Sequence, residues 1–147
     1  DWTKIAEIKN NPRMHIPVFG NGDVNSPEKA KEMRDDYGLD GAMIGRASIG
    51  NPWFFNQVKN YLQTGKKIDE PTIAERAEMA IRHLKMALDW KGDVLGVLET
   101  RRHYGTYFKG IANFKETKSK ILRENDPATI LHELELVKKT FFEKELV

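Results

Sequence analysis

Two short apolar runs in the first third of the chain are each followed at once by a glycine-containing loop and then by a helical pattern. The runs are residues 15–19 and 40–44, and the loops are residues 20–23 and 45–47. Strands that alternate with helices pair in parallel and are joined by right-handed crossovers. The pattern therefore predicts an α/β structure in which both loops lie at the carboxyl edge of one sheet.

Helical patterns surround these two strands and predict the order helix, strand, helix, strand, helix. The helices are expected at residues 1–10, 26–37 and 51–65. Ser26 is a good N-cap, and Pro27 suits the first helical position. Two strands are too few for a complete α/β sheet. We therefore expect these residues to be part of a longer chain, with exposed strand edges that favour self-association.

The remaining two thirds of the chain have an all-α pattern. Thr72 and Glu75 form a capping box that begins an amphipathic helix ending near Gly92. A second helix is expected to carry Leu95, Leu98, Tyr104 and Phe108 and to reach Lys109-Gly110. Two more helices follow, at 114–123 and from Asp126 onward. The pattern predicts a small helical bundle.

The composition excludes several classes of site. The chain has no cysteine, so these 147 residues hold no disulfide, thiolate metal site or cysteine nucleophile. The four histidines are scattered without metal-ligand spacing, and we assign no metal. No apolar run approaches the ~20 residues of a membrane helix, and no secretory leader is visible. These features fit a cytoplasmic protein.

The two loops predict a phosphate site. Gly22 and Gly45 let the backbone approach a ligand closely, and Arg46 supplies a planar cation for phosphate oxygens. In TIM barrels, the loops after the last two strands frequently bind phosphate. Two ordinary glycine turns and a surface arginine explain the same residues about as well. Asp23 is acidic and should not face the phosphate directly. It is expected to cap the next helix or to hold its loop, and a plain turn aspartate is an equally good interpretation.

A basic segment lies within the helical part. Residues 99–123 hold seven basic side chains against two acidic ones, a local net charge of +5 in a chain whose total is +2. Aromatic residues are interleaved with them, as suits phosphate contact and base stacking. Arg102 and Lys109 are seven residues apart and are expected to share a helix face. A solvated face is an equally good interpretation of the lysines, and Tyr104 and Phe108 are expected in the core.

Several motifs together resemble the tRNA-dihydrouridine synthase family, and most closely its bacterial B-type subgroup. They are IPVFGNGD at 16–23, GAMIGRA at 41–47, GNPWF at 50–54, RRHY at 101–104 and YFKG at 107–110. Either loop alone is a weak signal, whereas their order and spacing are specific. The resemblance spans nearly the whole chain.

The resemblance implies a flavoenzyme with an FMN-binding TIM barrel and a helical tRNA-binding domain. Residues 1–65 would be the last two βα units of the barrel, and residues 66–147 the helical domain. The FMN phosphate would be held by Asn21, Gly22, Asp23, Gly45 and Arg46. Arg101, Arg102 and Lys109 are the corresponding RNA-contact candidates. The family uses NADPH to reduce the flavin, which then reduces uridine in tRNA to 5,6-dihydrouridine.

One departure from the family pattern is the missing cysteine. The family's catalytic cysteine supplies a proton to the uracil and lies earlier in the barrel, so we expect the chain to be a C-terminal part that is inactive by itself. Two alternatives remain. A different FMN or phosphosugar barrel enzyme would share the loops but not the basic aromatic helix. A non-catalytic RNA-binding helical module would have no link to a flavin.

Overall fold

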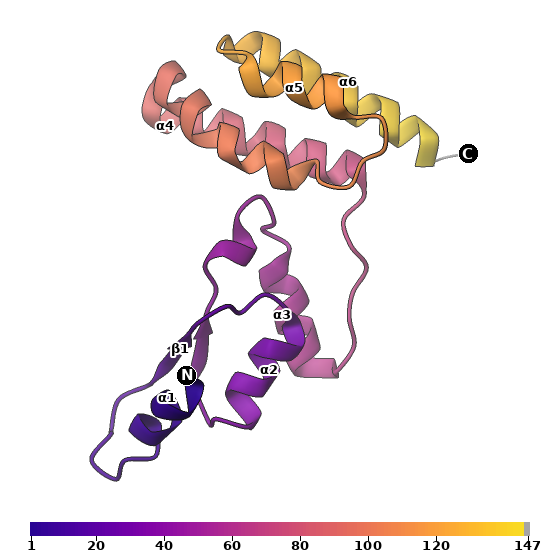
Figure 1. Ribbon diagram of the computed structural model, residues 1–147. Helices are drawn as coiled ribbons and strands as arrows, with labels where there is room; N and C mark the ends of the chain where they lie inside the picture. Colours follow the sequence, from indigo (N-terminus) through magenta and orange to yellow (C-terminus); the bar gives the residue numbers. More distant parts are fainter. Residues whose placement is uncertain (146–147) are drawn as a thin grey trace. The chain divides into compact units, whose positions relative to one another are not determined.

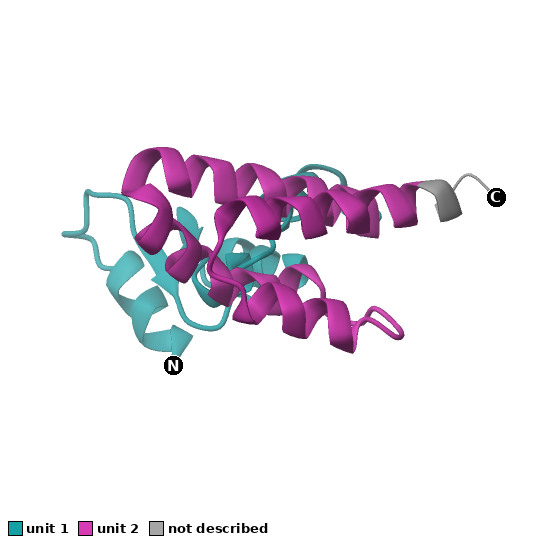
Figure 2. Cartoon of the chain, turned by 90° about the horizontal axis from the view of Figure 1, so that it is seen from above, with its two compact units in different colours: residues 1–69 teal, residues 70–147 magenta. Residues whose placement is uncertain are grey.

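The computed structural model describes residues 1–145, and the chain divides into two compact units, Asp1–Asp69 and Glu70–Val147 (Figure 2). Among the described residues, no helix is both long enough and apolar enough to cross a membrane. The first unit contains the only sheet in the described part of the chain, and the second unit is helical.

The first unit has the predicted order of helices and strands, with an additional short 3-10 helix (Figure 1). Its elements are α1 (Trp2–Lys9), β1 (Phe19–Asn21), α2 (Pro27–Asp35), β2 (Gly41–Met43), η1 (Arg46–Ser48) and α3 (Phe54–Thr64). β1 and β2 pair in parallel, and Phe19 lies opposite Gly41 while Asn21 lies opposite Met43. The parallel pairing confirms the prediction for this pair of strands.

One face of the sheet packs on α2, and the other is open. Gly20 lies against Met33 and Leu39, which leave no room for a side chain at that position. Phe19 and Met43 belong to the opposite face and are 65% and 58% exposed. The core therefore lies on the helical side of the sheet. Its buried members are Val24, Ala30, Met33, Leu39, Phe54 and Val58.

The first strand differs from the sequence prediction in position and burial. It begins at Phe19, whereas residues 15–19 were expected to form a buried strand, and Ile16 is 69% exposed. Pro17 has no N–H to donate to a ladder. The Val18 N–H donates to the Asp40 side chain at 2.7 Å, while the Asp40 N–H donates to the Val18 carbonyl. A carboxylate therefore replaces a backbone acceptor at the point where the ladder was expected to begin.

The start of α2 is as predicted. The Ser26 hydroxyl accepts a hydrogen bond from the Lys29 N–H at 3.2 Å, and Pro27 occupies the first helical turn. This cap fixes where the loop after β1 ends and the helix begins.

The second unit consists of α4 (Ile73–Tyr107), α5 (Lys115–Arg123) and α6 (Pro127–Glu145). The predicted capping box of Thr72 and Glu75 begins α4. At Gly92 the backbone leaves the helical region, with φ 74° and ψ 174°, and α4 folds back on itself as a hairpin (Figure 1). We call residues 73–91 the first arm and residues 93–107 the second arm. Helix α6 packs along α4.

The second arm buries a different face from the one predicted. Leu95 and Leu98 are about half exposed, whereas Tyr104 and Phe108 are buried as expected. The reason is the close crossing of the arms, because a side chain at Gly96 would lie 2.9 Å from the Leu88 backbone nitrogen. This contact turns one stripe of the second arm inward: Gly96, Val97, Thr100, Tyr104 and Tyr107.

The hairpin predicts opposite effects for two glycine substitutions. Gly92→Ala forces a side chain into a backbone region that glycine alone readily adopts, and should lower the free energy of unfolding by roughly 1–3 kcal/mol. The matched control is Gly105→Ala, because Gly105 is helical and a Cβ there meets nothing within 4 Å. It should leave stability unchanged or raise it by up to about 1 kcal/mol. Urea unfolding measures both, and an equal effect at the two positions would contradict the hairpin.

Candidate functional site

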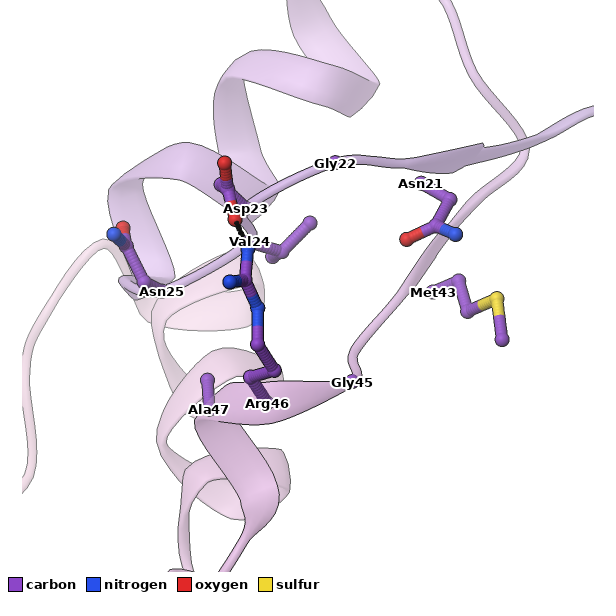
Figure 3. Close-up of a pocket in the computed structure, with 9 residues that line it drawn as sticks. All are labelled: Asn21, Gly22, Asp23, Val24, Asn25, Met43, Gly45, Arg46 and Ala47. Carbon is purple, nitrogen blue, oxygen red and sulfur yellow. Dashed lines mark hydrogen bonds and ion pairs between the residues drawn. The ribbon is translucent and has the colours of Figure 1, made fainter.

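The loops after β1 and β2 line one cavity of about 810 Å³. All five residues predicted to hold a phosphate lie on its wall: Asn21, Gly22, Asp23, Gly45 and Arg46 (Figure 3). They meet because β1 and β2 are parallel and both end at this edge of the sheet. Two loops more than twenty residues apart in sequence therefore form one site.

The first loop turns through two residues with positive φ. Gly22 has φ 149°, and Asp23 has φ 48°, a value that aspartate tolerates better than most residues. Gly22 is also required by packing, because a Cβ there would lie 2.9 Å from Nε1 of Trp2. Trp2 is itself fixed by an edge-on contact with Tyr37 and by the Lys29 ammonium 4.3 Å from its ring. Helix α1 therefore supports this wall of the cavity.

Arg46 and Asp23 connect the two loops. The Arg46 guanidinium donates to the Asp23 carboxylate across the cavity (Figure 3). Ser26 caps α2, so Asp23 does not cap that helix, and its carboxylate instead pairs with the other loop. Their side chains are 84% and 73% exposed, and ion pairs this exposed contribute little to stability. The guanidinium therefore lies beside the Asp23 carboxylate and remains accessible to an incoming anion.

The cavity has further lining residues that the sequence analysis did not identify: Val24, Asn25, Met43 and Ala47. Met43 lies opposite Asn21 in the strand register and is mostly exposed, so it adds an apolar surface to a polar wall. The sequence could have predicted that Met43 lines the cavity, because side chains alternate along the second strand and Met43 lies on the face opposite Ala42. The site thus combines one guanidinium and one carboxylate with close backbone approach and three apolar side chains.

The basic side chains of the helical unit have several different environments. Arg101 is half-buried, and it donates to the Glu124 carbonyl at 2.7 Å and to the Asn125 side chain at 2.8 Å. It thereby connects the second arm of α4 to the turn between α5 and α6. Lys120 forms an ion pair with Glu133 at 2.6 Å. Arg101 and Lys120 therefore both bind to other groups of the helical unit.

Arg102 and Lys109 are both exposed, but they do not share a helix face. Helix α4 ends at Tyr107, and Lys109 lies in the turn that follows it, where its carbonyl accepts from Arg76 at 3.4 Å. The expectation from seven-residue spacing is therefore wrong, because that spacing applies only while the helix continues. Lys115 and Arg123 are exposed as well and begin and end α5.

The two arms of α4 bring His83 and His103 together. Their ring centroids are 4.6 Å apart, and the Arg102 Nε donates to the His103 Nε2 at 3.3 Å. Burial and the Arg102 charge lower the pKa of His83, while burial, His83 and Arg102 lower the pKa of His103. Burial raises the pKa of Tyr107, whose hydroxyl lies 3.3 Å from the His83 Nδ1, to about 12. His83 is half-buried.

Within residues 1–145, no three histidine, cysteine, aspartate or glutamate side chains are grouped as a metal site requires. The two candidate binding features are the strand-end cavity and the basic helical unit. Together they define a two-part α/β and helical protein with a candidate anion site. Residues 1–144 match a family model described as dihydrouridine synthase, and the chain belongs to this family.

Curated relatives agree with the family model. A probable tRNA-dihydrouridine synthase of Rickettsia conorii is 37% identical over 130 residues, which are 88% of this chain and 39% of the relative. The tRNA-dihydrouridine synthase B of Pseudomonas putida is 40% identical over 120 residues, which are 82% of this chain and 35% of the relative. The chain therefore spans well under half the length of these relatives. The resemblance identified from its motifs is confirmed.

The histidine pair predicts a pH-dependent stability. Because the pKa values of His83 and His103 are lowered by folding, the unfolded chain binds protons more readily than the folded one. Their contribution should be complete above the ordinary histidine pKa of about 6.5, for example at pH ~7.5, and be lost progressively as the pH falls below that value, for example to pH ~5.5. Urea unfolding at both pH values should show a smaller loss in His83→Gln/His103→Gln than in the original chain. The exposed His132→Gln is the control, and an unchanged pH dependence in the double variant would refute the assignment.

Proposed function

We propose that this chain supplies the phosphate end of the FMN site and the tRNA-binding helical unit of a tRNA-dihydrouridine synthase. The complete enzyme would reduce uridine in tRNA to 5,6-dihydrouridine with NADPH as reductant, in the cytoplasm. One observation carries the proposal. Five residues from two strand-end loops converge on one cavity, in a chain that belongs to the dihydrouridine synthase family.

The cavity suits the phosphate end of a flavin nucleotide. Arg46 offers a planar set of donors, and Asp23 orients it without burying it. Gly22 and Gly45 present backbone without side chains on the two opposing loops. The volume of about 810 Å³ exceeds what a phosphate alone needs and leaves room for the attached polyol chain beside Asn21 and Met43. Bound FMN would supply the hydride chemistry, and these residues would bind and orient it.

The two βα units of the first unit fit the end of a TIM barrel. We propose that they are its last two units, because loops after the final strands of TIM barrels frequently hold phosphate. The open sheet face with Phe19 and Met43 would then point into the barrel interior, where side chains from the other strands would cover it. The chain has no cysteine, so the proton donor that the family uses must come from elsewhere. We therefore expect these 147 residues to be inactive by themselves.

The helical unit is proposed to bind the tRNA backbone through the exposed cations near the end of α4. Arg102 and Lys109 remain the principal candidates, since both side chains are exposed. Arg101 is proposed to act indirectly, because its guanidinium holds the turn between α5 and α6. RNA binding of this kind depends on counterion release and weakens steeply as salt is added.

Reversing the charge of Arg46 tests the flavin assignment. In the complete synthase, Arg46→Glu should lower FMN affinity by roughly 10- to 100-fold, because it removes a charge-assisted contact and adds repulsion. Arg13→Glu is the matched control, since it changes the net charge equally on the loop that precedes β1. Flavin fluorescence titration measures both, and equal affinities for the two variants would remove Arg46 from the phosphate site.

A second substitution tests the RNA surface. Arg102→Glu with Lys109→Glu should weaken tRNA binding and reduce the slope of log affinity against log salt by roughly two. Lys138→Glu with Lys139→Glu is the control, because these residues lie on α6 among acidic side chains. Filter binding over a salt series gives the slopes. If the first pair leaves the slope unchanged while the second lowers it, the RNA surface lies on α6 instead.

A further inference from the structure

A groove lies between the two arms of α4, near their connection, and Arg102 is one of the residues that line it. Its volume is about 350 Å³. The first arm contributes His83, Met86 and Trp90 to its wall, and the second arm contributes Arg102 and His103. The groove exists because Gly92 folds the helix back and Gly96 lets the arms cross closely. It is therefore a fixed feature of the hairpin.

Trp90 is the most exposed of the large hydrophobic side chains in the described residues, at 82%. The Lys91 ammonium lies 4.7 Å from the centroid of its ring, so a cation stands beside the indole. The ring lines the groove and is open to solvent, so a flat ligand can reach it. Flat aromatic surfaces of this kind bind nucleobases by stacking, with little preference for sequence.

The charges around the groove favour an anionic ligand. Its acidic residue, Glu99, is neutralised by an ion pair with Lys91. The Arg102 guanidinium donates to His103 through Nε, and its terminal nitrogens carry most of its donor capacity. These features suit a nucleotide. Its base would stack on the aromatic wall, its phosphate would contact the arginine, and the carboxylate is already neutralised. An apolar peptide would leave the guanidinium without a partner.

We propose that this groove binds one unstacked nucleotide of single-stranded RNA, with the base against Trp90 and its phosphate against Arg102. The inference rests on the proposed RNA-binding function of the helical unit and adds a stacking site to it. It also gives the two cations different roles. Arg102, on the second arm, would contact a nucleotide held in the groove, while Lys109, in the turn after α4, would contact the RNA backbone alone.

The test is a titration of the whole chain with three RNAs: unmodified tRNA, a single-stranded oligoadenylate of about ten nucleotides and a duplex of equal length. Single-stranded RNA should quench the tryptophan fluorescence of the original chain, and Trp90→Phe should abolish most of that quenching. Trp90→Ala should lower affinity for the single strand by roughly 5- to 100-fold and for the duplex far less. Because Trp90 is so exposed, the substitution should not unfold the unit.

Phe142→Ala is the matched control, since Phe142 is another exposed aromatic residue of the same unit, on α6. If all RNAs bind but Trp90→Ala binds them as the original chain does, the groove proposal is overturned and the proposed function stands. If no RNA binds even at low salt, the RNA-binding function fails and the groove proposal fails with it. If the original chain forms dimers that Trp90→Ala abolishes while RNA affinity is unchanged, the groove is a contact for a second copy, and the proposal is again overturned.

Discussion

The parallel register of β1 and β2 is the constraint on which the candidate flavin site depends. Because both strands run in the same direction and end together at Asn21 and Met43, the loops that follow them open into one cavity. An antiparallel pairing would place the two loops at opposite ends of the sheet. Once the loops are adjacent, the Arg46 guanidinium forms an exposed ion pair with Asp23 of the other loop.

The helical unit depends in a similar way on one backbone reversal. Gly92 turns a single helical sequence into two crossing arms, and the close approach at Gly96 determines which side chains face inward. The same crossing brings His83 next to His103 and opens the groove beside Trp90. Arg101 then holds the turn between α5 and α6 against the second arm. Core, histidine pair and groove thus follow from the same local geometry.

Local signals in the sequence predicted much of this fold. The Ser26 cap, the capping box at Thr72 and the break at Gly92 all depend on neighbouring residues, and each is present in the structure. The convergence of the two loops followed from the strand–helix alternation. The errors concern contacts between distant segments. Leu95 and Leu98 fit an amphipathic pattern, but the crossing at Gly96 turns them outward. Lys109 was expected to share a helix face with Arg102, but α4 ends before it, at Tyr107. No pattern along the sequence could reveal the Arg46–Asp23 pair, since their loops come together only through the sheet.

The central claim is that this chain combines a flavin-phosphate cavity with an autonomous tRNA-binding helical unit. Titrating unmodified tRNA into the chain at about 50 mM and about 200 mM salt tests the second half directly. The account predicts binding at the lower salt concentration and a steep loss of affinity at the higher one. Binding that is independent of salt, or none at the lower concentration, would contradict it.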